Sequence, residues 1–176
     1  GIPLGVLASR SPTTARVTLS AVGLLQTIPS LALLAFMVPL TGVGWKPALV
    51  ALFVYSILPI VRNTYTGLTT LPGNLSEAAH ALGLPVSAQL WRIRLPMASP
   101  SILAGIKTSS VINVGTATLA ALVGAGGLGE SILQGISLLD HEMIFQGAIP
   151  AALLALLAQA FWDAVERFIV PRGLRI

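Results

Sequence analysis

"VTLSAVGLLQTIPSLALLAFMVPL" is the sequence of residues 17–40, and it contains no charged side chain. A helix of about 20 apolar residues is long enough to cross the hydrocarbon core of a bilayer. The composition of the whole chain agrees, because charged residues make up 9% of its 176 positions, whereas soluble domains carry about 25%. We therefore predict an all-α fold, a polytopic bundle of transmembrane helices that forms a single domain over residues 1–176.

Three further apolar runs are predicted to span the membrane, over residues 45–65, 99–124 and 144–162. Trp45 and Tyr65 bound the first of them, where interfacial aromatic residues belong. Residues 1–8 are interpreted as the end of a span whose beginning is missing. Since the first residue is not methionine, we expect the numbering to start inside the natural chain. The expected subunit has about five spans.

The arginines are distributed unevenly over the loops. If the spans alternate, the loops 9–16, 62–97 and 163–176 share one side and carry all the arginines, whereas the opposite side has only Lys46. Positively charged residues are retained on the cytoplasmic side of a membrane. This asymmetry places residues 72–96 in the cytoplasm.

Several classes of activity are disfavoured by the residues present. The chain has no cysteine, and His80 and His141 fall on opposite sides of the membrane, so we expect no metal site. "GAGGLG" at 124–129 matches a dinucleotide-binding pattern but follows a membrane span, so we interpret it as a turn that lets backbones pack closely. Neither lysine follows the glycine that a Walker phosphate loop requires. The basic residues are scattered singly, which disfavours nucleic acid. We expect no enzyme.

Two of the spans carry polar residues that could line a translocation path. Asn113 lies on a helical face of small residues spaced four apart, a pattern that more often serves close helix packing. Pro29 leaves a carbonyl without its usual donor in the middle of the run 17–40. Lys107 is expected to extend its side chain toward the cytoplasmic interface. The candidate path residues are Gln26, Pro29, Ser30, Ser109, Asn113 and Thr116.

Residues 77–96, "EAAHALGLPVSAQLWRIRLP", form a charged segment between long apolar runs. A helix that starts at Glu77 is expected to end at Gly83, since glycine is the usual residue after a helix C-terminus. A second helix over 86–94 is expected to end before Pro96 and to lie at the membrane surface. Together they predict a rigid projection that fits a partner's groove.

This segment carries a specific resemblance. Glu77-Ala78-Ala79, Gly83, Ile93, Leu95 and Pro96 resemble at every position the EAA loop of ATP-binding-cassette importer permeases, the cytoplasmic helix that docks into the ATPase subunit. The runs 24–44, 58–68 and 116–136 resemble the osmoprotectant branch, whose permeases serve importers of glycine betaine, carnitine and choline. By this resemblance, the ATPase-docking residues are Glu77, Ala78, Ala79, His80, Ala81, Leu82, Gly83 and Leu84, and the loop is supported by Ile93, Leu95 and Pro96.

The resemblance also implies a type I importer permease of the bacterial cytoplasmic membrane. Its implied partners are an ABC ATPase that holds ATP and Mg²⁺, an extracytoplasmic substrate-binding protein, a second permease copy and membrane lipid. The chain itself is expected to bind no cofactor. Two alternatives remain open, a methionine-type permease and a non-transporting membrane scaffold that docks a soluble partner.

Overall fold

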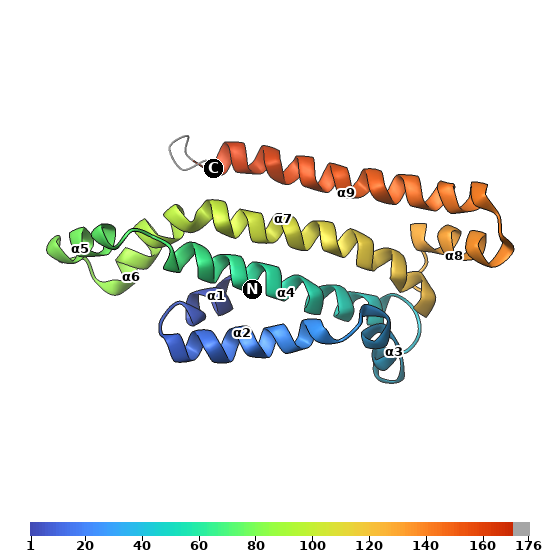
Figure 1. The fold of residues 1–176 in the computed structure, drawn as a ribbon, viewed down its shortest axis with the longest axis horizontal. Helices are drawn as coiled ribbons and strands as arrows, with labels where there is room; N and C mark the ends of the chain where they lie inside the picture. The colour runs from blue at the N-terminus through green and yellow to red at the C-terminus, as the bar shows by residue number, and fades with distance from the viewer. Residues whose placement is uncertain (171–176) are drawn as a thin grey trace.

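The computed structural model describes residues 1–170, with the exception of the Ser76 side chain, and all its regular elements in that range are helical. The helices are α1 (Ile2–Ala8), α2 (Pro12–Thr27), α3 (Ser30–Thr41), α4 (Trp45–Thr69), α5 (Gly73–Ala81), α6 (Val86–Gln89), the π-helix η1 (Leu90–Arg94), α7 (Leu95–Leu119), the 3₁₀-helix η2 (Ala120–Val123), α8 (Leu128–Leu138) and α9 (His141–Ile169). The predicted all-α class is confirmed. Figure 1 shows α9, α7, α4 and α2 side by side in a row, with α5 and α6 projecting beyond one end.

Three described helices are long and apolar enough to cross a membrane: α4, the continuous stretch Val86–Val123, and α9. The pair α2 and α3 passes the same test together, although it is bent by 88°. The run 17–40 is thus two helices and not a single straight span.

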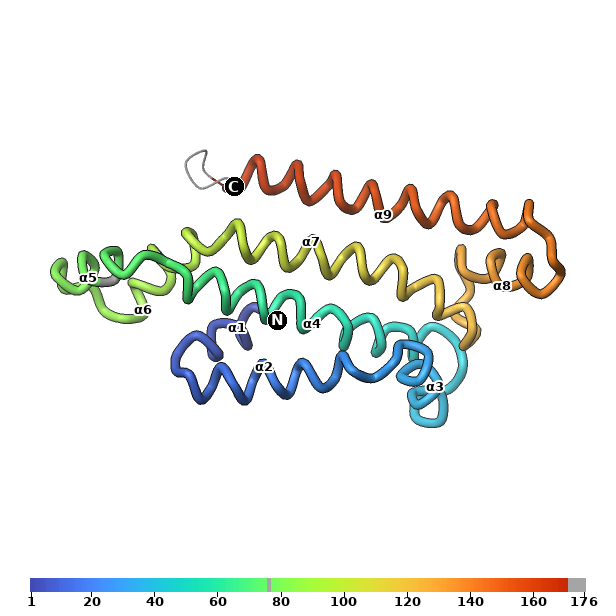
Figure 2. The backbone as a smooth tube through the Cα atoms, viewed as in Figure 1, coloured from blue at the N-terminus to red at the C-terminus, as the bar shows by residue number. Residues whose placement is uncertain are grey.

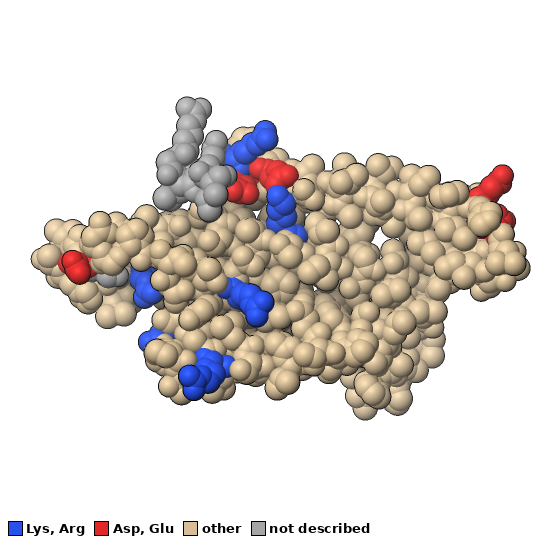
Figure 3. Space-filling model, in the orientation of Figure 1, with Lys and Arg blue, Asp and Glu red and all other residues tan. Residues whose placement is uncertain are grey.

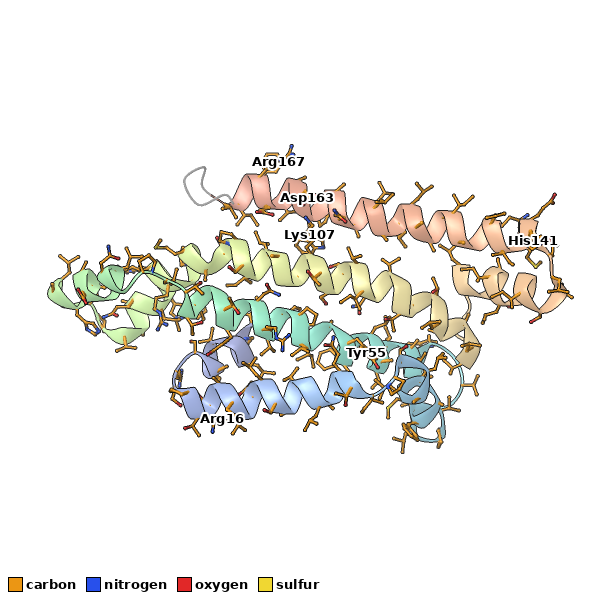
Figure 4. All side chains as sticks on the ribbon, viewed as in Figure 1. Arg16, Tyr55, Lys107, His141, Asp163 and Arg167 are labelled. Carbon is orange, nitrogen blue, oxygen red and sulfur yellow. The ribbon has the colours of Figure 1, made fainter. Side chains whose placement is uncertain are left out.

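The bend between α2 and α3 has a local cause and a tertiary support. Ile28 is extended, with φ −68° and ψ 122°, and the following Pro29 has no N–H to continue the α2 hydrogen bonds. The Tyr55 hydroxyl of α4 donates a hydrogen bond to the Ile28 carbonyl (Figure 4). Because lipid offers no partner to a free carbonyl, this bond helps to stabilise the break inside an apolar environment.

Helices α4 and α7 pack closely against each other. A Cβ atom placed on Gly105 of α7 would lie 2.8 Å from the Pro59 carbonyl oxygen and 2.8 Å from Asn63 Cβ, both on α4. Small residues allow this backbone approach, which drives helix association in lipid through van der Waals contact. The small-residue face of α7 therefore serves close packing, as the sequence favoured.

Arginines lie near one end of the row of helices, whereas acidic residues lie near both ends. Arg10 lies at the turn between α1 and α2, and Arg92 and Arg94 lie in η1, all near the end where α5 and α6 project (Figures 2 and 3). Asp140 and Glu142 lie at the turn between α8 and α9, at the opposite end. The position of these arginines at one end agrees with the orientation inferred from the sequence.

Candidate functional site

The projection at the arginine-rich end is built around a helix and a glycine turn. Helix α5 begins at Gly73, earlier than the expected start at Glu77. It ends as expected, with Gly83 at φ 68°. The Leu84 N–H donates to the Ala79 carbonyl at 3.1 Å and the Gly83 N–H to the His80 carbonyl at 2.9 Å, which is the Schellman pattern of a helix C-terminus. The turn is therefore closed by backbone hydrogen bonds.

The predicted docking residues divide between an outer and an inner face of α5. Those exposed to solvent are Glu77, Ala78, His80, Ala81, Leu82 and Gly83. Leu84 is half-buried, whereas Ala79 is only 2% exposed. Ala79 lines a small hollow under α5 together with Ile93. It therefore packs inside the projection in this structure, and its docking role stays a prediction.

Gln89 holds the projection together and was not identified from the sequence. Its side chain is 6% exposed, and its Nε2 donates to the Leu84 carbonyl at 2.8 Å and lies 3.4 Å from His80 Nδ1. A buried amide of this kind is costly unless it is bonded, so Gln89 fixes α6 against the glycine turn. Its spacing of four residues from Ile93 is the signal that could have placed it on the inner face.

The second helix of the projection runs directly into the membrane span. The Leu95 N–H bonds to the Leu90 carbonyl, five residues earlier, so η1 joins α6 to α7 without a break. The expected helix end before Pro96 is wrong, because Pro96 falls in the first turn of α7, where a missing N–H is tolerated. Arg94 Nη2 also donates to the Leu68 carbonyl of α4 at 3.2 Å. A displacement of α6 would therefore move α7.

The remaining loop residues support this junction. Ile93 is half-buried in the hollow under α5. Leu95 packs on the buried cluster of Leu68, Ala98 and Ile102, while Pro96 is exposed.

A cavity of about 470 Å³ lies between α4, α7, α9 and the glycine-rich segment. Its lining residues are Trp45, Ala48, Leu49, Leu52, Ser110, Asn113, Val114, Ala117, Thr118, Ala120, Ala125, Gly126, Gly127, Leu128, Gly129, Ala151 and Leu154. Asn113 Oδ1 is buried and has no hydrogen-bond partner among the described residues. The indole of Trp45 is 63% exposed. The cavity thus has a largely apolar lining and an exposed aromatic residue at Trp45, whereas the unpartnered Asn113 Oδ1 is itself buried.

The six predicted path residues do not gather in this cavity. Asn113 lines it, whereas Ser109 and Thr116 are buried elsewhere on α7, and Thr116 Oγ1 donates to the Ile112 carbonyl at 3.1 Å. Gln26, Pro29 and Ser30 lie at the bend between α2 and α3. The six residues therefore lie in two groups, and their role in a translocation path stays a prediction.

The glycine-rich segment 124–129 behaves as the close-packed turn that its sequence indicated. Gly126 and Gly127 have φ angles of 72° and 82°, in the region that favours glycine. A Cβ atom on Gly129 would lie 2.7 Å from the carbonyl carbon of Thr118. The segment brings α8 back against the end of α7.

Polar side chains join α7 to α9 (Figure 4). Lys107 Nζ forms an ion pair with Asp163 Oδ1, and Trp162 Nε1 donates to Ser110 Oγ at 2.8 Å. Lys107 therefore has a partner on the neighbouring helix, and its extension toward the cytoplasmic interface stays a prediction. Helix α9 continues to Ile169, beyond the predicted span end at 162, and so carries Asp163 to the lysine.

Residues 1–170 contain no group of three or more His, Cys, Asp or Glu side chains that could hold a metal ion. The candidate functional features of the described residues are the projection, which is continuous with α7, and the cavity between α4, α7 and α9.

Comparison with known proteins places this arrangement in a family. The chain is 44% identical over 174 residues to the choline transport system permease protein OpuBB of Bacillus subtilis (strain 168), an alignment that covers 99% of this chain and 80% of the relative. It is 43% identical over 180 residues to the osmoprotectant import permease protein OsmW of Salmonella typhimurium, covering 99% of this chain and 84% of the relative.

A solved structure shares the fold. A chain of the MetNI methionine ABC transporter in an inward-facing conformation superposes with a TM-score of 0.86 at 26% sequence identity, over 97% of this chain and 86% of that chain. The family described as "Binding-protein-dependent transport system inner membrane component" matches residues 1–173. The chain, a multi-pass membrane protein, therefore belongs to the binding-protein-dependent transport system inner membrane component family of ABC importer permeases.

Proposed function

We propose that this chain is the permease subunit of an ATP-driven importer of quaternary ammonium osmoprotectants, such as choline, carnitine and glycine betaine, in the bacterial cytoplasmic membrane. A separate ABC ATPase would hold ATP and Mg²⁺, and an extracytoplasmic binding protein would deliver the solute. Two permease copies would enclose the path, because the three to four spans of the described residues are too few to surround it alone.

The observation that carries the coupling role is the continuity of the projection with α7. Helix α5 presents its outer face to solvent, Gln89 fixes the glycine turn, and η1 leads without a break into the span. Closure of the ATPase subunits around α5 would therefore be transmitted to α7 as a rigid displacement. Coupling by rocking of helices in this way is a form of alternating access.

The substrate class rests on the relatives and agrees with the cavity. OpuBB, at 44% identity, is a choline transport permease by its name. The face of an aromatic ring attracts a methylated cation, and the cavity combines Trp45 with largely apolar walls. Such a lining suits brief contact in passage more than tight binding, since it supplies no countercharge.

The second candidate substrate is methionine, which the likeness to the MetNI structure favours. That likeness is at 26% identity, whereas the osmoprotectant relatives reach 44%, so the quaternary ammonium class is preferred. A membrane scaffold without transport remains the alternative from another class.

The test is ATP hydrolysis and uptake by the full-length permease reconstituted with its ATPase and binding protein. Choline, carnitine or glycine betaine should stimulate ATP hydrolysis, and methionine should not. Gly83→Val should reduce the stimulated rate roughly tenfold, because the left-handed conformation of Gly83 costs a β-branched residue about 1–2 kcal/mol.

Gly73→Val is the matched control, since Gly73 also lies in α5 but has no positive φ. A Cβ atom placed there would have no neighbouring atom within 4 Å. It should retain stimulated hydrolysis. Stimulation of ATP hydrolysis by methionine alone would show that the substrate is methionine and not a quaternary ammonium solute. Full coupled transport by Gly83→Val would show that the glycine turn is not needed for coupling. The absence of any solute-stimulated hydrolysis in the complete complex would favour the scaffold over the importer.

A further inference from the structure

A groove runs between α1 and the segment that leads from α6 into α7. It consists of two adjoining hollows of about 530 and 620 Å³. Both hollows are lined by Val6, Arg10, Leu90 and Trp91, so they form one continuous groove. One wall is the short helix α1, and the other is the π-helical junction of the coupling projection.

The chemistry of the groove changes along its length. The first hollow adds apolar walls from α1, including Leu4 and Leu7. The second hollow adds Ser9, Ser87 and Arg94 beside the shared Arg10. No Asp or Glu among the described residues lines either hollow. The groove is therefore apolar at one end and positively charged at the other.

The groove also lies at the membrane surface on the arginine-rich side. Arg10 marks the turn between α1 and α2, and Trp91 lies where η1 enters the span, with its indole 71% exposed. Tryptophan at a span end is typical of the interface between headgroups and acyl chains. An occupant at this level meets lipid on its apolar side and the cytoplasm on its polar side.

We propose that this groove binds an anionic phospholipid, with an acyl chain along α1 and the phosphate beside Arg10 and Arg94. Guanidinium groups pair with phosphate through two parallel hydrogen bonds. Arg94 uses one N–H on the Leu68 carbonyl, and a guanidinium carries five such donors. The anionic charge of the cytoplasmic leaflet draws such lipids to basic side chains.

Binding of this lipid would bear on coupling. The phosphate would lie between α1 and η1, and η1 connects the projection to α7. The lipid would therefore stabilise the position from which α6 transmits movement to the span. This role is independent of which solute the importer carries.

Crosslinking with a photoactivatable phosphatidylglycerol tests the site directly. The full-length permease in complex with its ATPase would be reconstituted in phosphatidylcholine vesicles that contain the probe, and crosslinked peptides would be identified by mass spectrometry. Crosslinks should fall in residues 2–10 and 86–95. Arg10→Gln should lower them about fivefold, the effect of one basic side chain at an anionic surface, and Arg10→Lys should keep most of them.

Arg16→Gln is the matched control, because Arg16 is an exposed arginine of the same cytoplasmic corner that does not line the groove. It should leave the crosslinks unchanged. Equal labelling by a photoactivatable phosphatidylcholine, equal loss in Arg16→Gln, or crosslinks confined to peptides outside residues 2–10 and 86–95 would overturn the proposal. The readout is lipid contact and not transport, so it is distinct from a failure of the proposed substrate or coupling role.

Discussion

Helix α7 is held on two sides by different means. On the α4 side, Gly105 lets the two backbones approach closely. About a third of the most apolar 18-residue stretch of α4 is buried. On the α9 side, Lys107 pairs with Asp163, and Ser110 accepts a hydrogen bond from Trp162. Only 6% of the most apolar 18-residue stretch of α9 is buried. One seam depends on shape and the other on polar bonds.

The difference is instructive because lipid provides no hydrophobic force between helices. Association in a bilayer must come from close van der Waals packing or from hydrogen bonds and ion pairs. The α4 seam uses the first route, which tolerates no added volume. The α9 contact uses the second, which tolerates changes of shape but leaves an unpaired polar group when one partner is removed. The two seams should therefore fail in response to different substitutions.

The largest effect is expected at the α4 seam. Gly105→Leu should destabilise the permease by about 3 kcal/mol, because the added carbons meet the Pro59 carbonyl and Asn63 Cβ, which overpacks the seam. A Cβ atom placed on Gly115 of the same helix would have no atom of another element within 4 Å, so Gly115→Leu should be close to neutral. Thermal unfolding of the detergent-solubilised proteins compares the two variants. Equal stability of both would mean that α4 and α7 do not pack through Gly105.

A smaller effect is expected at the α9 contact. Lys107→Met should destabilise by about 1–2 kcal/mol because it leaves Asp163 uncompensated, and the cost is below that of a fully buried pair since the two side chains are 29% and 40% exposed. The double variant Lys107→Met, Asp163→Leu should recover most of the loss. The same unfolding measurement, arranged as a double-mutant cycle, gives the coupling energy. Additive losses would show that the two side chains do not interact.

The smallest effect is expected for the neutral bond beside the ion pair. Trp162→Phe keeps the aromatic ring but removes the donor to Ser110 Oγ, and should cost about 0.6 kcal/mol, the usual size of a hydrogen bond between membrane helices. Ser110→Ala should cost a similar amount, and the double variant no more than either. A loss in Trp162→Phe that Ser110→Ala does not share would assign the effect to the ring instead of the bond.

Features that depend on neighbouring residues along the chain could be predicted from the sequence. The long apolar runs fixed the all-α membrane class, since about 20 residues must satisfy their own backbone to cross a bilayer. Gly83 was recognised as the end of α5, because a left-handed residue after a helix is chiefly a glycine position. The docking role of residues 77–84 comes from the resemblance of residues 77–96 and stays a prediction.

The tertiary structure alone decided which distant residues meet. Lys107 and Asp163 are 56 positions apart, and nothing in the local pattern around Lys107 distinguishes a paired lysine from one that extends to the interface. Ala79 and Gln89 turned inward because α5 folds back onto η1, so their burial depends on a contact between two helices. The 88° bend at Pro29 likewise depends on a distant residue, since the Tyr55 hydroxyl of α4 donates a hydrogen bond to the Ile28 carbonyl. Local propensity sets where a helix begins and ends, whereas the partners of its polar side chains are set by the elements that pack against it.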